Sequence, residues 1–234
     1  AALFLMGGFA LFGKNPINIL PFFLGVWIYA KLHHQPMARY STAAIYSSML
    51  APVVSAVMEM RVIWYPVRFV LAGAVGASIS YIIIPLAEHS FSTHMGYTLF
   101  NYGFAGGLIA LVIASVLRAM GADISTKNFW ALGVEAHVLG IMLFLIFAFL
   151  LAGLWMCGWS FGLYLRIMRH SGRAPTDFVL TDGIGPAMVN MGVMGLISLG
   201  YILLVQGDLN GPVVGAILTS IGFAAAGEHP KNTL

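Results

Sequence analysis

Four asparagines in an otherwise apolar sequence are the residues best suited to bind a ligand. Asn101 and Asn190 each begin the pattern Asn-x-Gly-x-x-Gly at the start of a long apolar run. Asn18 and Asn232 each end the pattern Gly-x-x-Pro-x-Asn. A primary amide offers one acceptor and two donors, and leaving it unsatisfied in apolar surroundings costs several kcal/mol. We therefore predict that these side chains hydrogen-bond a small polar solute.

The glycines of the first pattern are predicted to keep a solute path open. Glycine lets the backbone or a ligand approach closely, so Gly103, Gly106, Gly192 and Gly195 would line the pore. The alternative is helix packing, because small residues at three- and four-residue spacing bring membrane helices together. Both interpretations stay open for these four. Packing is favoured for five other glycines: Gly73, Gly76, Gly153, Gly158 and Gly162.

The second pattern is predicted to interrupt a membrane helix. Pro16 and Pro230 suit the first position of a helix because proline has no amide hydrogen to lose there. The free N–H groups of such an end can face a polar group of a substrate, and a break is tolerated in a membrane where it lines a wet cavity. The two prolines are therefore predicted to line the pore. The residues around the breaks favour the alternative, a tight loop at the membrane surface: Lys14, Glu228, His229 and Lys231.

No arrangement typical of an enzyme is found. Glu88, His89 and His94 lie close in sequence but lack the regular spacing of metal ligands, which favours a solvated loop. Cys157 is the single cysteine, so the chain can form neither an internal disulfide nor a cysteine metal cluster. A nucleophile paired with a base, a phosphate-binding loop and an HExxH helix are all absent from the sequence. We predict no enzymatic activity, no metal site and no cofactor.

The composition places these residues in a membrane protein. Hydrophobic residues make up 60% of the chain and charged residues 8%, whereas globular proteins carry roughly a quarter charged. The Lys and Arg residues are scattered between apolar runs, which argues against nucleic-acid binding despite the net charge of +3. With about 20 apolar residues per crossing, we predict an all-α, multi-pass protein of the cell inner membrane, in contact with the lipid bilayer. Its segments are 1–13, 17–31, 42–58, 67–87, 95–118, 129–165, 185–205 and 211–226, and those at 17–31 and 211–226 are short enough to be half-helices.

The first residues of the chain are similar in sequence to the last residues. At an offset of 214 residues, Gly8, Gly13 and Leu20 match Gly222, Gly227 and Leu234, and both proline–asparagine breaks align. We therefore predict one transmembrane domain, 1–234, containing one repeat unit at 14–227, with 1–13 and 228–234 belonging to flanking copies. About seven apolar segments per period would place successive copies in opposite orientations, as in inverted-repeat transporters. The missing copy, or a second chain in a homo-oligomer, is the expected partner.

Four stretches of the chain resemble a family of bacterial multi-span membrane proteins that is known as a domain of unknown function. They are Phe12–Pro21, Leu50–Ser55, Asn101–Gly107 and Gly227–Asn232. This resemblance implies no particular activity, and it implies a protein longer than this chain. The order of motifs is also remotely similar to urea transporters, with Asn15-Pro16 and Asn101-Tyr-Gly103-Phe104 as the corresponding residues. That similarity implies a pseudo-two-fold solute path, although here the asparagine precedes the Gly-Phe pair and the motifs lie further apart.

Together these features predict a transporter or channel for a small polar, largely uncharged, urea-like solute, with its site where the helix breaks meet the repeat interface. The alternative is a membrane scaffold or complex subunit without transport activity, in which the Gly and Asn motifs serve helix packing. A polar cavity lined by the asparagines would favour transport, whereas asparagines bonded to neighbouring helices would favour the scaffold.

Overall fold

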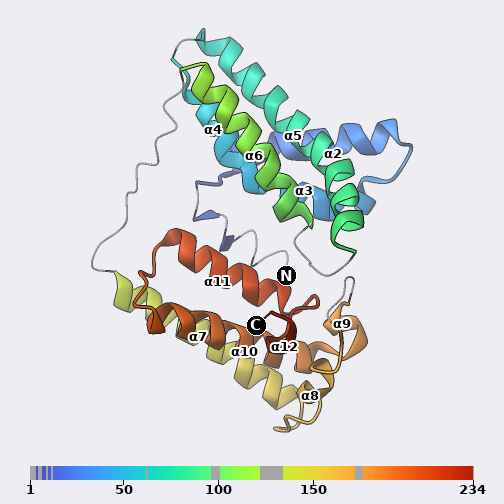
Figure 1. Cartoon of the computed structure of the whole chain (residues 1–234), viewed down its shortest axis with the longest axis vertical. Coiled ribbons are helices and arrows are strands. Elements are labelled where there is room, and N and C mark those ends of the chain that lie inside the picture. The colour runs from blue at the N-terminus through green and yellow to red at the C-terminus, as the bar shows by residue number, and fades with distance from the viewer. Residues whose placement is uncertain are drawn as a thin grey trace. The chain divides into compact units, whose positions relative to one another are not determined.

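The regular secondary structure of the chain is helical. The computed structural model describes residues 4, 7, 8, 10, 11, 13–61, 63–95, 101–121, 134–171 and 176–233, and within them every regular element is a helix (Figure 1). The predicted all-α class is therefore confirmed for the part of the chain that is described.

Among the described residues, five helical stretches are long and apolar enough to cross a membrane: Met37–Glu59, Tyr65–Thr93, Asn101–Ala119, Glu135–Met156 and Ile184–Leu204. Helices α2 (Pro16–Leu32) and α11 (Gly211–Phe223) are apolar but shorter, as predicted for these two segments. Large apolar side chains remain exposed on the long helices, for example Leu111 at 68% and Phe144 at 76%. Apolar side chains exposed on long apolar helices are expected where a helix meets lipid.

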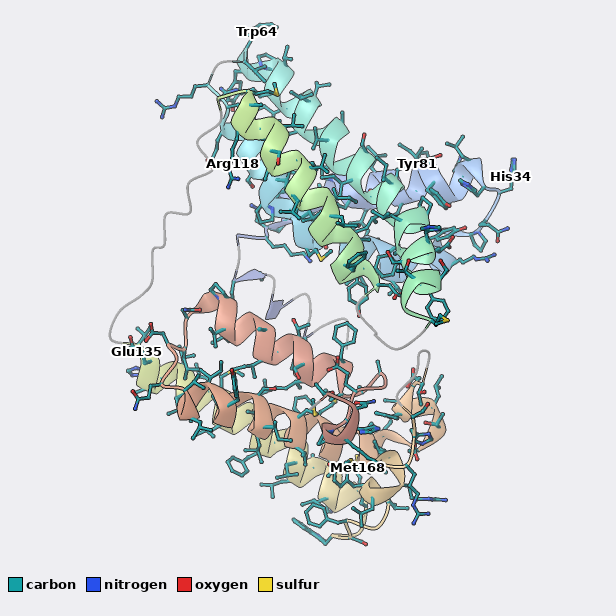
Figure 2. The ribbon with its side chains drawn as sticks, in the orientation of Figure 1. His34, Trp64, Tyr81, Arg118, Glu135 and Met168 are labelled. Atoms are coloured by element: carbon teal, nitrogen blue, oxygen red, sulfur yellow. The ribbon has the colours of Figure 1, made fainter. Side chains whose placement is uncertain are left out.

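Aromatic and charged residues mark the ends of the long helices. Trp64 immediately precedes α5 (Tyr65–His94), Arg118 lies in the last turn of α6 (Asn101–Ala119), and Glu135 begins α7 (Glu135–Met156) (Figure 2). Tryptophan is enriched at the membrane–water interface, and charged residues prefer the aqueous ends of a span. This placement is consistent with long helices that cross a membrane.

The chain divides into two compact units. The N-terminal unit comprises residues 12–95 and 100–128, and the C-terminal unit comprises residues 1–11, 96–99 and 129–234. The predicted repeat boundaries at 14 and 227 do not coincide with this division, and they stay a prediction.

The N-terminal unit is built around α5. Helix α2 packs along α5, and the bent stretch from 37 to 59 packs beside both. A Cβ atom at Gly76 would lie 2.7 Å from Pro21 Cβ and 2.9 Å from Val54 Cγ2, so glycine is needed where α5 meets its neighbours. The bent stretch consists of two α-helices and two 3-10 turns: Met37–Tyr40, α3 (Ser41–Ser47), Ser48–Leu50 and α4 (Ala51–Glu59).

The C-terminal unit is built around the pair formed by α7 and α10 (Ile184–Leu204). A Cβ atom at Gly153 would lie 2.6 Å from the backbone N of Val189, and one at Gly192 would lie 2.9 Å from the backbone N of Leu150. These glycines therefore let the two backbones approach more closely than side chains would allow. The shorter helices of the unit are α8 (Tyr164–Ile167), α9 (Phe178–Thr181), α11 and α12 (Pro230–Thr233).

Replacing Gly153 by alanine is expected to destabilise the protein by about 1–3 kcal/mol, because the new methyl group would meet backbone atoms of α10. Gly140, on the same helix, has open space within 4 Å of the position that a Cβ atom would occupy, so Gly140→Ala is the matched control. Alanine has the higher helix propensity, and the control is expected to be neutral or up to about 1 kcal/mol more stable. Unfolding of the two variants in detergent measures the difference, and equal midpoints would contradict the close α7–α10 approach.

Candidate functional site

The first helix break is closed by two asparagines. The Asn15 side chain accepts hydrogen bonds from the N–H groups of Ile17 and Asn18, each at 3.0 Å. In return, Asn18 Oδ1 accepts from the N–H of Asn15 at 2.8 Å, and Asn18 Nδ2 donates to the carbonyl of Gly13 at 2.9 Å. Gly13 has φ +84°, a conformation that favours glycine. Pro16 occupies the first position of α2, as predicted.

The second break repeats these bonds at the offset of 214 residues. Asn232 Oδ1 accepts from the N–H of His229 at 2.8 Å, and Asn232 Nδ2 donates to the carbonyl of Gly227 at 2.9 Å. The imidazole of His229 replaces the amide of Asn15, because His229 Nδ1 accepts from the N–H of Lys231 at 3.2 Å. Gly227 has φ +126°, and Pro230 begins α12.

Asn18 and Asn232 thus satisfy the backbone groups of their own helix starts. Asn18 is 1% exposed, and its Nδ2 also donates to Ser55 Oγ of α4 at 3.0 Å, so the amide is bonded within the N-terminal unit. Asn232 is exposed. In the structure, both side chains cap the helix starts at the breaks. Their role as solute ligands stays a prediction.

Asn190 holds the second break from α10. It is fully buried, and its Nδ2 donates to the carbonyls of Ala224 at 2.7 Å and Glu228 at 2.6 Å. Two carbonyl acceptors fix which side of the amide carries the nitrogen. The Oδ1 atom therefore points elsewhere, and it is buried without a hydrogen-bond donor from the described residues. The side chain has one acceptor left for a ligand and no donor.

The predicted pore-lining glycines of α10 lie at helix contacts. A Cβ atom at Gly192 would lie 2.8 Å from Leu150 Cβ, and one at Gly195 would lie 2.7 Å from Ile146 Cγ1. Gly106 of α6 is buried against Met49, whereas Gly103 is exposed. Asn101 is the first described residue of α6 and is partly buried.

Sequence reasoning missed the burial of two titratable residues in the second break. Glu228 is 6% exposed and His229 is 1% exposed, although their polarity had favoured a surface loop. Burial raises the pKa of the Glu228 carboxyl to about 7. At the equivalent position of the first break, burial lowers the pKa of Lys14 to about 8. The run of small residues at the start of the second break, Ala224 to Gly227, was the signal that could have indicated close packing.

His229 bonds to His170, which lies between α8 and α9. Its Nε2 lies 2.9 Å from the carbonyl of His170. Since its Nδ1 accepts from Lys231, the hydrogen must be on Nε2, and the geometry selects neutral His229. His170 Nε2 in turn lies 2.8 Å from Asp182 Oδ2, and the Phe178 ring contacts both imidazoles.

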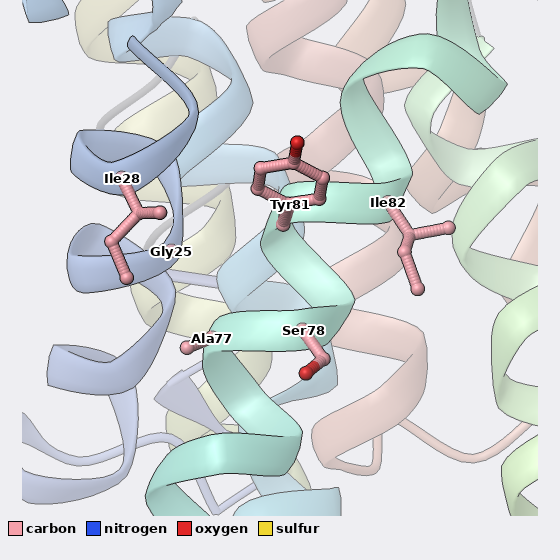
Figure 3. A pocket seen from close by; sticks show the side chains of 6 residues that line it. All are labelled: Gly25, Ile28, Ala77, Ser78, Tyr81 and Ile82. Atoms are coloured by element: carbon pink, nitrogen blue, oxygen red, sulfur yellow. The ribbon is translucent and has the colours of Figure 1, made fainter. Parts of the chain in front are cut away.

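Among the described residues, two pockets combine a volume sufficient for a small solute with polar lining residues. One, of about 230 Å³, lies between α2 and α5 and is lined by Gly25, Ile28, Ala77, Ser78, Tyr81 and Ile82 (Figure 3). The other, of about 310 Å³, lies between α10 and α11, with Ser198, Tyr201 and Thr233 as its polar residues. None of the four asparagines lines either pocket. The pocket between α10 and α11 nevertheless adjoins the second break, because Thr233 Oγ1 donates a hydrogen bond to Asn232 Oδ1 at 3.2 Å.

Comparison with protein families identifies the chain. The family model of DUF1576, described as a protein of unknown function, matches residues 1–119 and 156–234. The chain belongs to the DUF1576 family. The match includes both breaks and the Asn101 and Asn190 motifs of this DUF1576 protein, as the resemblance at those stretches led us to expect. No curated protein and no solved structure matches the chain.

Proposed function

We propose that this DUF1576 protein is a transporter or channel of the bacterial inner membrane for a small polar, largely uncharged solute. In this proposal it consists of inverted repeats, and the solute path passes the two helix breaks. The observation that carries the proposal is the pair of breaks, which share their hydrogen bonds at Gly13/Gly227, Asn18/Asn232 and the capping residue. Discontinuous helices in equivalent positions of two repeats are typical of binding sites in secondary transporters.

The packing of the first residues of the chain supports inversion. Residues 8 and 11 correspond in sequence to residues 222 and 225, at the end of α11 and just beyond it. A Cβ atom at Gly8 would lie 2.8 Å from the carbonyl of Gly215, and one at Gly211 would lie 3.4 Å from the carbonyl of Leu11. Gly8 thus lies near Gly215, and Leu11 lies near Gly211. The residue number rises along the first segment as it falls along α11, so the two segments run antiparallel. Antiparallel packing of equivalent segments is what a two-fold axis in the membrane plane produces.

The number of apolar segments is consistent with this arrangement. The five long helical stretches of the described residues, together with α2 and α11, make seven segments within the predicted repeat. An odd number of crossings returns the next copy in the opposite orientation. In this proposal α2 and α11 are the half-helices that flank the breaks.

Solute flux into proteoliposomes tests the proposal. Stopped-flow light scattering is expected to show faster influx of urea, acetamide or glycerol than in protein-free liposomes. Asn18→Ala and Asn232→Ala, which remove the side chains that close the breaks, are expected to slow this influx about tenfold or more. The matched control is Asn210→Ala, which removes an asparagine cap at the start of α11 outside the breaks. Influx at the protein-free rate for all three solutes would refute the proposed function.

A specific observation favours the second candidate, a scaffold or complex subunit. Asn18 and Asn190 use both amide hydrogens on protein acceptors, and Gly192 and Gly195 lie at helix contacts. These are the contacts expected if the motifs serve packing. Asn101→Leu separates the two candidates. If Asn101 of α6 is a solute ligand, its replacement lowers the solute flux, whereas a scaffold shows no solute flux with or without the substitution.

A further inference from the structure

The second break carries a set of acceptors without matching donors. Asn190 Oδ1 is buried and has no donor among the described residues. Glu228 as a residue is 6% exposed, and no hydrogen bond or ion pair of its carboxyl group occurs within the described part of the chain. Helix α11 also ends here, and the C-terminal end of a helix carries partial negative charge. All three features favour a cation.

No described side chain supplies that cation. Helices α10 and α11, which pack around the break, contain no Lys, Arg, His, Asp or Glu. His229 is neutral in its hydrogen-bonding geometry, and His170 is bonded to Asp182. The remaining charged residues of the neighbouring described segments are exposed: Arg166, Arg169, Asp177 and Lys231. Burial alone raises the pKa of Glu228, with no charged group contributing, which agrees with this description.

We propose that the break at residues 224–232 binds a small monovalent cation, either a proton or Na⁺, at the Glu228 carboxyl and Asn190 Oδ1. This inference rests on the proposed transport function, since the bound cation would be the coupling ion for solute movement. Helix ends and unwound backbone at such breaks are established positions for Na⁺ or H⁺ in transporters. The first break carries Lys14 at the position of Glu228, so cation binding is confined to the second.

Binding of the cation is measured without transport. The purified full chain in detergent is titrated with NaCl at constant ionic strength, with choline chloride as replacement, and thermal unfolding is followed. In parallel, infrared difference spectra record the carboxylic acid C=O band on either side of neutral pH. The variant is Glu228→Gln, and the matched control is Glu135→Gln, an exposed carboxyl at the start of α7.

A Na⁺-dependent rise in unfolding temperature that is lost in Glu228→Gln and kept in Glu135→Gln supports a Na⁺ site. Glu228→Gln is expected to lower the affinity for Na⁺ about tenfold or more. A carboxylic acid band that disappears as pH rises through neutrality, and that only Glu228→Gln lacks, supports a proton site. The absence of both signals overturns the inference. Solute flux in proteoliposomes distinguishes the two proposals. Flux that is unchanged by the cation concentration and by Glu228→Gln overturns this inference alone. Cation binding without flux of any solute supports this inference and refutes the transport function.

Discussion

Replacing Asn190 by leucine is expected to destabilise the protein by roughly 3–5 kcal/mol. The substitution removes the hydrogen bonds to the carbonyls of Ala224 and Glu228, and both carbonyls lie in a buried segment. Each carbonyl left without a donor costs about 1–3 kcal/mol. The loss of the orphaned Oδ1 atom offsets part of this cost. Because these two bonds join α10 to the second break, the segment from 224 to 229 is expected to open.

Chemical unfolding in detergent measures this loss, and Met191→Leu is the matched control. Met191 is the next residue on α10 and is 6% exposed, and Met-to-Leu changes conserve volume. The control is expected to change stability by less than about 1.5 kcal/mol. If both variants unfolded at the same denaturant concentration as the unsubstituted protein, the stabilising role of the two Asn190 hydrogen bonds would be contradicted.

The helices and the breaks could be predicted because their signals are local. Apolar runs indicated the positions of the long helices, and the Gly-x-x-Pro-x-Asn pattern indicated both helix starts at Pro16 and Pro230. A capping pattern acts over three to five residues, so a short stretch of sequence contains all of its partners. The sequence also indicated that α2 and α11 are shorter than the other apolar helices.

The partners of the side chains could not be predicted because they depend on tertiary contacts. Asn190 bonds carbonyls 34 and 38 residues away, and nothing in its own motif names them. The same limit applies to Gly192 and Gly195, whose close neighbours are Leu150 and Ile146 on another helix. Residue type was misleading for Glu228 and His229, since charged residues are rarely buried unless they are paired. Functional sites are where such general preferences fail, which is why the second break is the region to test.

The stability of the protein is expected to fall as pH rises from about 4.5 to about 7, and Glu228→Gln is expected to remove this part of the pH dependence. The carboxyl has a pKa of about 7 in the folded protein against 4.5 as the reference value. The folded state therefore binds the proton more tightly than the unfolded state does. Its contribution is fully present below about pH 4.5 and is lost as pH rises through about 7.

At 1.36 kcal/mol per pKa unit, this loss amounts to roughly 3 kcal/mol. The difference in unfolding free energy between the unsubstituted protein and Glu228→Gln, followed across this pH range, isolates the contribution of Glu228. Glu135→Gln, which removes an exposed carboxyl, is expected to keep the full pH dependence. Parallel curves for the unsubstituted protein and Glu228→Gln would mean that Glu228 is solvated in the folded state, and the break would then lack the buried carboxyl on which cation binding depends.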